Sequence, residues 1–263
     1  MNLLIWIIIF TAIGGILSIL AASVFLLLPD SKRHALLPHG ISLATGALLT
    51  VAFGGLIPEA FAQVKVEQFH QLSATILLGI LIFFMLEKLL IWRHYHVSDE
   101  ETYSQTHSHL HYHGQHSAGT LILIGDAIHN FVDGILIAAA FLTDLHLGIV
   151  TSLAVATHEI PQEVGDFAIL LQSGYAKKQA LIFNMLSSLT TVIGGILAYY
   201  SLNYLHSHLA YILALAASSF IYIAVADLIP ALHQNTDLKT SIQQMLWILT
   251  GVLLIGSLEL FAH

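Results

Sequence analysis

The stretch Gly125-Asp126-Ala127-Ile128-His129-Asn130-Phe131-Val132-Asp133-Gly134 lies in the middle of an apolar segment that runs from about 118 to 142. A membrane-spanning helix needs about 20 mostly apolar residues, and this segment has that length. At about 100° per residue, one helix face of about 100° of arc holds all four of its strongly polar side chains, Asp126, His129, Asn130 and Asp133. Ionisable groups are costly deep in a bilayer, so the stretch predicts a functional stripe in a membrane helix.

A second polar stretch, His158-Glu159-Ile160-Pro161-Gln162-Glu163-Val164-Gly165-Asp166, lies in the next apolar segment, 146–172. Its polar side chains fall within about 140° of one helix face. If the two stripes face each other, they bring together two imidazoles, several carboxylate oxygens and two amide oxygens. This mixture suits a borderline divalent ion such as Zn²⁺, and Fe²⁺, Mn²⁺, Co²⁺ or Cd²⁺ could take its place.

Two other interpretations fit the same residues. A buried polar network between two helices would need no metal, although so many polar groups on two neighbouring stripes favour the metal site. An intramembrane zinc hydrolase is the chemical alternative. Its His-Glu-x-x-His motif is absent, because Gln162 replaces the second histidine and Pro161 interrupts the helix. We therefore expect neither an enzyme nor a prosthetic group.

The composition of the whole chain places these stripes in a membrane protein. Its 263 residues are 57% hydrophobic and only 9% charged, whereas a soluble domain carries roughly 25% charged residues. Such a composition excludes a disordered chain, a coiled coil and a basic nucleic-acid-binding protein. The absence of cysteine excludes disulfides and thiolate metal sites. We predict an all-α polytopic domain over 1–263 in the lipid bilayer, with spans at roughly 3–28, 38–61, 71–92, 118–142, 146–172, 178–202, 207–231 and 242–262.

The positive residues predict the orientation. Seven of the eight lysines and arginines fall on one side of an eight-helix bundle, and only Lys65 falls on the other. Cytoplasmic loops carry the excess of positive charge, so both termini are expected outside. No Lys or Arg precedes Lys32, so the first span does not have the pattern of a signal peptide. With no targeting signal and no large ectodomain in view, we expect a bacterial inner (plasma) membrane.

A weak internal repeat relates spans 1–3 to spans 6–8. Thr11 to Leu17 resembles Thr191 to Leu197, Leu56-Ile57-Pro58 recurs as Leu228-Ile229-Pro230, and Gly79 followed by Leu86-Glu87 recurs as Gly251 followed by Leu258-Glu259. Three helices repeated after two intervening ones must run in the opposite direction. Inverted repeats are typical of secondary transporters, whose substrate site lies near the midplane. Spans 4 and 5, which carry the polar stripes, lie between the two copies.

A histidine-rich segment, 94–116, separates spans 3 and 4. Seven histidines fall within its 23 residues: His94, His96, His107, His109, His111, His113 and His116. Their His-x-His spacing favours labile metal binding, and the predicted orientation makes this a cytoplasmic loop. The alternative is a solvated linker that merely tolerates histidine.

The two polar motifs resemble those of the ZIP (ZRT/IRT-like protein) family of divalent-metal transporters. His-Asn-Phe-x-Asp-Gly at 129–134 and His-Glu-x-Pro-x-Glu-x-Gly-Asp at 158–166 are similar to the branch that carries His-Glu-x-Pro-His-Glu-x-Gly-Asp. The resemblance covers essentially the whole chain, including the outside termini and the histidine-rich loop. It implies a metal site made of His129, Asn130, Asp133, His158, Glu159 and the residue at 162, with Glu163 next along the stripe.

The chain departs from this branch at two positions. Gln162 stands where the branch has His, and a neutral amide is a poorer Zn²⁺ ligand, so a second adjacent ion is not expected. Gly55 stands where we would expect a histidine in span 2. The resemblance further implies alternating access, in which helices that carry the site move against the rest, and it implies homodimers, since these are common among relatives.

Together these observations predict a secondary transporter that moves Zn²⁺ or a similar divalent ion toward the cytoplasm. The direction follows from the family resemblance alone. A divalent-metal exporter and an intramembrane hydrolase are the alternatives.

Overall fold

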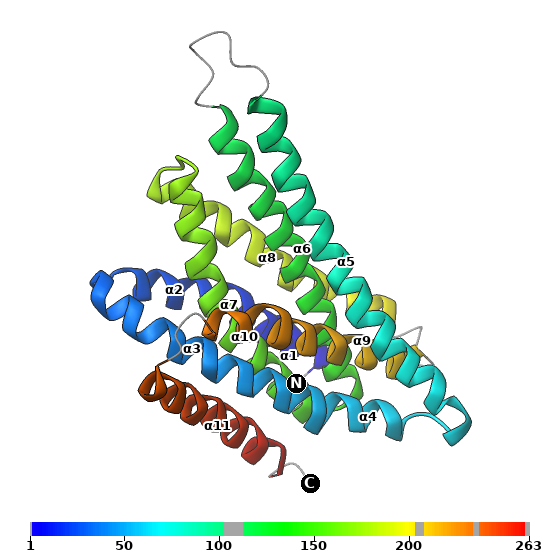
Figure 1. Cartoon of the computed structure of the whole chain (residues 1–263). Helices are drawn as coiled ribbons and strands as arrows, with labels where there is room; N and C mark the ends of the chain where they lie inside the picture. Colours follow the sequence, from blue (N-terminus) through cyan, green and yellow to red (C-terminus); the bar gives the residue numbers. More distant parts are fainter. Residues whose placement is uncertain (1, 103–112, 203–207, 234–236, 261–263) are drawn as a thin grey trace.

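The computed structural model describes residues 2–102, 113–202, 208–233 and 237–260, and within these ranges the chain forms helices and no strand (Figure 1). The helices follow one another in this order: α1 (Leu3–Ala12), η1 (Ile13–Leu17), α2 (Ser18–Leu26), α3 (Asp30–Thr50), η2 (Val51–Leu56), α4 (Ile57–Ala62), η3 (Val66–Gln68), α5 (Phe69–Thr102), α6 (His113–Thr143), α7 (Leu145–Gln172), α8 (Lys177–Leu202), α9 (Leu209–Tyr222), η5 (Ile223–Leu228), α10 (Ile229–Leu232) and α11 (Leu238–Leu260).

Seven helical segments in the described part of the chain are long and apolar enough to cross a membrane. They coincide with seven of the eight predicted spans, which confirms the prediction of an all-α polytopic membrane protein. The remaining span is the 28-residue helix α7. It carries the ionisable residues His158, Glu159, Glu163 and Asp166, which count against it as an apolar span. That α7 is the eighth span, and that both termini lie outside, stay predictions.

Two spans contain a π-helical turn directly before a proline. η2 ends one residue before Ile57-Pro58, and η5 ends before Ile229-Pro230, at the same offset of 172 residues. A proline inside a helix has no N–H and its ring crowds the carbonyl four residues earlier. The wider π turn relieves this crowding while the helix continues. The repeated Leu-Ile-Pro therefore produces the same irregularity in both copies.

The repeat also appears in helix packing. α3 packs on α11, where a Cβ at Gly251 would overlap the Leu43 carbonyl. α5 packs on α9 at the equivalent positions, where a Cβ at Gly79 would lie 3.1 Å from Leu215 Cδ2. Both pairs are related by the offset of 172, so the two copies build two equivalent interfaces.

α6 packs closely on α8 at the centre of the bundle. A Cβ at Gly134 would overlap the Thr191 carbonyl, and one at Gly194 would overlap the Phe131 carbonyl. Small residues at helix crossings in membranes let the backbones approach in this way. The close contact fixes the rotation of α6, and with it the direction of the polar stripe.

The helices extend into both ends of the histidine-rich segment. α5 continues through His94 and His96 to Thr102, and α6 begins at His113. The ribbons of α5 and α6 extend beyond the other helices at one end (Figure 1). His107, His109 and His111 lie outside the described residues, so the loop between 94 and 116 and its cytoplasmic location stay predictions.

Candidate metal centre

Four of the predicted ligands converge in the structure. One ligand atom from each of His129, Asp133, His158 and Glu159 lies within 4.8 Å of the others. His158 Nε2 is 3.2 Å from Asp133 Oδ2 and 3.6 Å from Glu159 Oε1. His129 Nε2 is 3.7 Å from Asp133 Oδ2, 3.5 Å from Glu159 Oε1 and 3.4 Å from His158 Nε2.

These separations fit one tetrahedral ion. Zn²⁺ holds nitrogen and oxygen ligands at about 2.0–2.1 Å, which puts the ligand atoms of a regular tetrahedron about 3.3 Å apart. The five distances lie between 3.2 and 3.7 Å. Two imidazoles and two carboxylates can therefore enclose a divalent ion with little rearrangement, and the carboxylates would neutralise its charge.

The burial of these side chains also indicates a bound cation. Asp133, His158 and Glu159 are buried, and His129 alone is partly exposed, with 25% of its side chain accessible. Both carboxylate oxygens of Asp133 and both of Glu159 are buried without a hydrogen-bond partner. Unpaired buried acceptors cost about 1–3 kcal/mol each, and more when charged. A cation among these oxygens would remove that cost.

The local helix geometry explains why these residues meet. His129 and Asp133 lie one turn apart on α6, so they share a face. Nδ1 of His158 lies 3.4 Å from the carbonyl oxygen of Ala154, on the preceding turn of α7. A metal-binding histidine commonly donates its second ring N–H to such a carbonyl, which leaves the other nitrogen for the metal. The ring orientation places Nε2 of His158 in the centre, 3.2 Å from Asp133 Oδ2.

Asn130 is directed toward α8 and its own helix. Its Nδ2 donates to Asp126 Oδ1 at 2.9 Å, and its Oδ1 accepts a hydrogen bond of 2.6 Å from Thr191 Oγ1. Asp126 in turn accepts a short hydrogen bond from Ser187. Because its oxygen already has a donor, Asn130 holds α6 against α8 in this structure. Its role as a ligand stays a prediction.

Comparison with known proteins settles the family. The model of the ZIP zinc transporters matches residues 92–259, which is more than half of the chain. The chain belongs to the ZIP family. The match begins in α5 and covers both polar stripes and the second copy of the repeat.

Individual members of the ZIP family are similar to the chain over different lengths. Zinc transporter ZIP13 of Pongo abelii is 32% identical over 233 residues, which are 84% of this chain and 66% of the relative. Zinc transporter ZIP10 of Danio rerio is 37% identical over 142 residues, 51% of this chain and 17% of the relative. Zinc transporter ZIP4 of Homo sapiens is 40% identical over 136 residues, 52% of this chain and 20% of the relative.

The chain thus spans just under two thirds of ZIP13 and a fifth or less of the matched ZIP10 and ZIP4. All three relatives are named as transporters. The ZIP family is a family of transporters and not of enzymes, which confirms the prediction that the chain is not an enzyme.

The two remaining predicted ligands lie further along α7. Gln162 is half-buried, one turn beyond His158. Glu163 is buried, and its Oε1 accepts a hydrogen bond of 2.6 Å from Ser188 Oγ on α8. Glu163 is therefore directed toward α8, whereas Glu159 is directed toward α6. Whether Gln162 and Glu163 are ligands stays a prediction.

A buried polar stripe on α8 supports the two helices that carry the polar motifs, α6 and α7 (the motif helices). It is absent from the residues predicted from the sequence. It consists of Asn184, Ser187, Ser188 and Thr191. The spacing i, i+3, i+4, i+7 puts all four on one helix face and is the signal that could have revealed it. Ser and Thr pass easily for packing residues in membrane helices, which hides such a stripe.

Gly55, the other departure from the ZIP branch, faces a carboxylate from α11. A Cβ at Gly55 would lie 2.8 Å from Glu259 Oε1 and 2.9 Å from Leu147 Cδ1. Oε1 of Glu259 is buried and has no hydrogen-bond partner. The space beside the backbone at Gly55 is thus occupied by the carboxylate of another helix.

Proposed function

We propose that this protein carries Zn²⁺ or a similar divalent transition metal across the membrane through a midplane site formed by His129, Asp133, His158 and Glu159. The observation that carries the proposal is the set of five ligand-atom separations of 3.2–3.7 Å among these four side chains. Membership in the ZIP family and the zinc-transporter names of its relatives support metal as the substrate.

Alternating access needs a group of helices that moves as one body. Hydrogen bonds join both motif helices to α8, from Thr191 to Asn130 and from Ser188 to Glu163. α1 and α2 pack on the same group, since a Cβ at Gly15 in η1 would lie 2.6 Å from the Ser188 carbonyl oxygen. We infer that α1, α2, α6, α7 and α8 move together.

The remaining long helices provide the frame in this proposal. α3 pairs with α11 and α5 with α9 through the two equivalent interfaces of the repeat. One contact joins the first turn of α7 to the end of α11, where His146 Nε2 lies 2.6 Å from the Leu258 carbonyl oxygen. The predicted topology puts this contact on the outer side, so it would have to break when the site opens outward.

The alternative functions make different demands on the site. A zinc hydrolase needs an open coordination position beside three protein ligands. The four side chains here would complete a tetrahedron without water, which favours transport. An exporter would use the same site and differs from an importer only in direction. We propose import, on the family resemblance.

Radiolabelled Zn²⁺ uptake into proteoliposomes tests the proposal. Wild-type protein should accumulate metal above empty vesicles, and unlabelled Fe²⁺, Mn²⁺, Co²⁺ and Cd²⁺ added in turn would rank the competing substrates. Uptake no faster than in empty vesicles, by protein shown to be folded, would refute transport. Zinc that stays bound to the protein through chelator washing would favour the hydrolase. Cells that express an importer should grow better in limiting zinc, whereas cells that express an exporter should grow better in toxic zinc.

Three further features remain proposals alongside this function. The histidine-rich segment would buffer or sense cytoplasmic metal, the protein would form a homodimer, and its location would be a bacterial inner membrane. Crosslinking in native membranes and fractionation of the source cells test the last two.

A further inference from the structure

The polar stripe of α6 divides into two pairs of side chains with different surroundings. His129 and Asp133 belong to the metal centre, and both oxygens of Asp133 are buried without a hydrogen-bond partner. Asp126 and Asn130 are buried as well, but the polar atoms of both side chains have partners. The two pairs lie about 60° apart around the helix axis. The first pair therefore needs a cation, whereas the second does not.

A closed ring of hydrogen bonds between α6 and α8 satisfies the second pair. Thr191 Oγ1 donates to Asn130 Oδ1 at 2.6 Å, and Asn130 Nδ2 donates to Asp126 Oδ1 at 2.9 Å. Ser187 Oγ donates to the other oxygen, Asp126 Oδ2. Asp126 and Asn130 lie one turn apart on α6, as Ser187 and Thr191 do on α8, so the two helix backbones close the ring.

The ring also fixes the direction of the Asn130 amide. In the reverse orientation the amide oxygen would face the carboxylate of Asp126, and two acceptors cannot satisfy each other. The amide nitrogen therefore faces Asp126, and the oxygen faces Thr191 on α8. Asn130 is 0% exposed, and a buried network whose members are all satisfied is rigid. The amide oxygen is thus held by the hydroxyl of Thr191.

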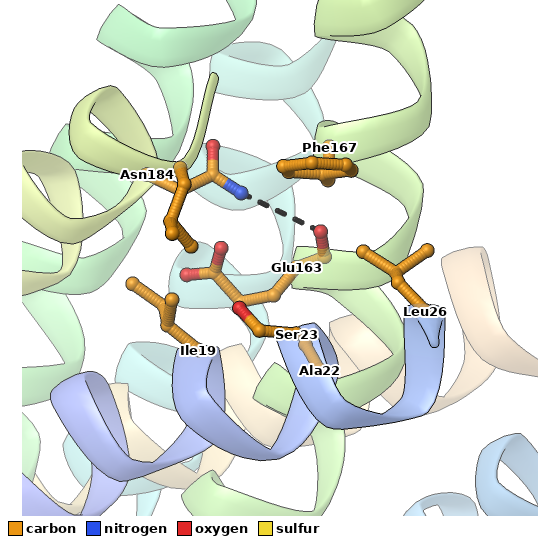
Figure 2. Close-up of a pocket in the computed structure, with 8 residues that line it drawn as sticks. Ile19, Ala22, Ser23, Leu26, Glu163, Phe167 and Asn184 are labelled. Carbon is orange, nitrogen blue, oxygen red and sulfur yellow. Dashed lines mark hydrogen bonds between the residues drawn. The ribbon is translucent and has the colours of Figure 1, made fainter. Parts of the chain in front are cut away.

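The contact between α7 and α8 is less complete. Ser188 Oγ donates to Glu163 Oε1 at 2.6 Å, and Asn184 Nδ2 lies 3.5 Å from the Glu163 carbonyl oxygen. Glu163 Oε2 and Asn184 Oδ1 are buried without a partner, beside a mostly apolar pocket between α2, α7 and α8 (Figure 2). Of the two motif helices, α6 is therefore the one whose rotation on α8 is set by a fully satisfied network.

We infer that Asn130 is a positioning residue of the metal centre, whereas the family resemblance implies a ligand, and that Thr191 and Ser187 act through the same ring. The inference deepens the proposed function and rests on it. Because the ring holds one side of α6 on α8, His129 and Asp133 are turned toward α7. The centre keeps four converging ligands, the number that Zn²⁺ takes in a closed tetrahedral site.

Zinc binding to the purified protein in detergent separates the two roles of Asn130, because they predict different effects of Thr191→Val. This variant removes the hydroxyl from a side chain of similar shape. A ligand role predicts unchanged or tighter binding, since Asn130 loses a competitor of the metal. A positioning role predicts weaker binding, since the ring opens. We expect the dissociation constant for Zn²⁺ to rise about tenfold or more, the usual effect of losing a partner that orients metal ligands.

Two further variants keep the test informative if Thr191→Val folds poorly. Thr191→Ser retains the hydroxyl and should restore wild-type zinc affinity. Ser187→Ala opens the ring at its other end and should weaken zinc binding as Thr191→Val does.

Thr190→Val is the matched control. Thr190 Oγ1 donates to the Ala127 carbonyl oxygen at 2.7 Å, so Thr190 also joins α8 to α6 but lies outside the ring. Unfolding temperatures without metal are measured in parallel for each variant. We expect Thr190→Val to lower the unfolding temperature and to leave the dissociation constant for Zn²⁺ at the wild-type value.

Zinc binding by Thr191→Val that is as tight as in the wild type, or tighter, would overturn the inference and favour Asn130 as a ligand. Equal weakening in Thr191→Val and Thr190→Val would also overturn it, since the packing of α6 on α8 would then explain the loss. If folded wild-type protein binds no zinc, the metal centre itself is refuted, and the proposed function falls together with this inference.

Discussion

His158 Nε2 lies 3.2 Å from Asp133 Oδ2, the shortest of the five distances within the candidate metal centre. This contact joins α7 to α6 and therefore depends on how the two helices pack. Both oxygens of Asp133 are buried and have no hydrogen-bond partner. An ion that binds here would tie the two motif helices together.

Removal of a ligand should abolish transport. We expect His129→Ala and Glu159→Ala to reduce Zn²⁺ uptake to the level of empty vesicles, because each removes one of four converging donors. His70→Ala and Glu67→Ala, at exposed positions of the same residue types, are the matched controls and should transport normally. Uptake within about twofold of wild type for both site variants would refute the assignment, since a lost zinc ligand normally costs much more.

The substitution Asp133→Asn tests the contribution of the negative charge of Asp133 separately from that of its size. The substitution keeps the size of the side chain and one oxygen but removes a negative charge from a site whose other converging side chains are His129, His158 and Glu159. We expect uptake to fall nearly as far as in Glu159→Ala, with normal amounts of protein in the membrane. Metal binding by isothermal titration should weaken in parallel, and unchanged affinity would show that Asp133 is not a ligand.

Substitution of Gln162 should change selectivity. Gln162 lies one turn after His158, within about 40° on the same helix face, so we expect it to be directed at the same space. Gln162→His adds a nitrogen donor and should shift the preference toward Zn²⁺ over Mn²⁺. Competition uptake measures this ratio, and an unchanged ratio would mean that Gln162 serves packing or hydrogen bonding.

Gln162→Glu should favour a second ion. A carboxylate added beside Asp133 and Glu159 repels them unless a cation neutralises the group. We expect metal stoichiometry to rise above that of the wild type and uptake to become more sensitive to pH. Equilibrium dialysis gives the stoichiometry. If it equals that of the wild type, the site has no room for two ions.

The histidine-rich segment should be dispensable for transport. Replacement of its histidines by serine leaves the ends of α5 and α6 intact, which a deletion of 95–116 would not. We expect substantial uptake and weaker peripheral metal binding in a variant changed at His94, His96, His107, His109, His111, His113 and His116. Complete loss of uptake in stably inserted protein would place these residues on the transport path.

Two glycines of the motif helices should respond oppositely to alanine. A Cβ at Gly134 would overlap the Thr191 carbonyl, so Gly134→Ala must separate α6 from α8 and should destabilise the protein by about 1–3 kcal/mol. Gly165 on α7 has no atom within 4 Å of its Cβ position. Because alanine favours a helix by up to about 1 kcal/mol over glycine, Gly165→Ala should be neutral or stabilising. Unfolding temperatures in detergent compare the two, and equal effects would contradict the packing of α6 on α8.

Hydropathy and helical periodicity predicted most of this protein from the sequence. The apolar stretches coincide with the helices of the structure because a bilayer demands about 20 apolar residues in each span. The four converging side chains were all among the predicted ligands: His129 and Asp133 lie one turn apart on α6, and the adjacent His158 and Glu159 both belong to the polar stripe of α7. The repeated Leu-Ile-Pro also pointed to two equivalent halves, although not to the π-helical turns that precede Pro58 and Pro230.

Only the tertiary structure decided which members of each stripe face each other. The stripe on α7 covers about 140° of arc, wide enough to reach two neighbouring helices. Glu159 turns toward α6, whereas Glu163 turns to Ser188 on α8 and opens a second pocket with Asn184. On α6, Asn130 likewise turns to α8, where it accepts a hydrogen bond from Thr191. Periodicity fixes directions around one helix axis, but the rotation of each helix against its neighbours is set where the backbones touch, as at Gly134 and Gly194, and no single helix contains that information.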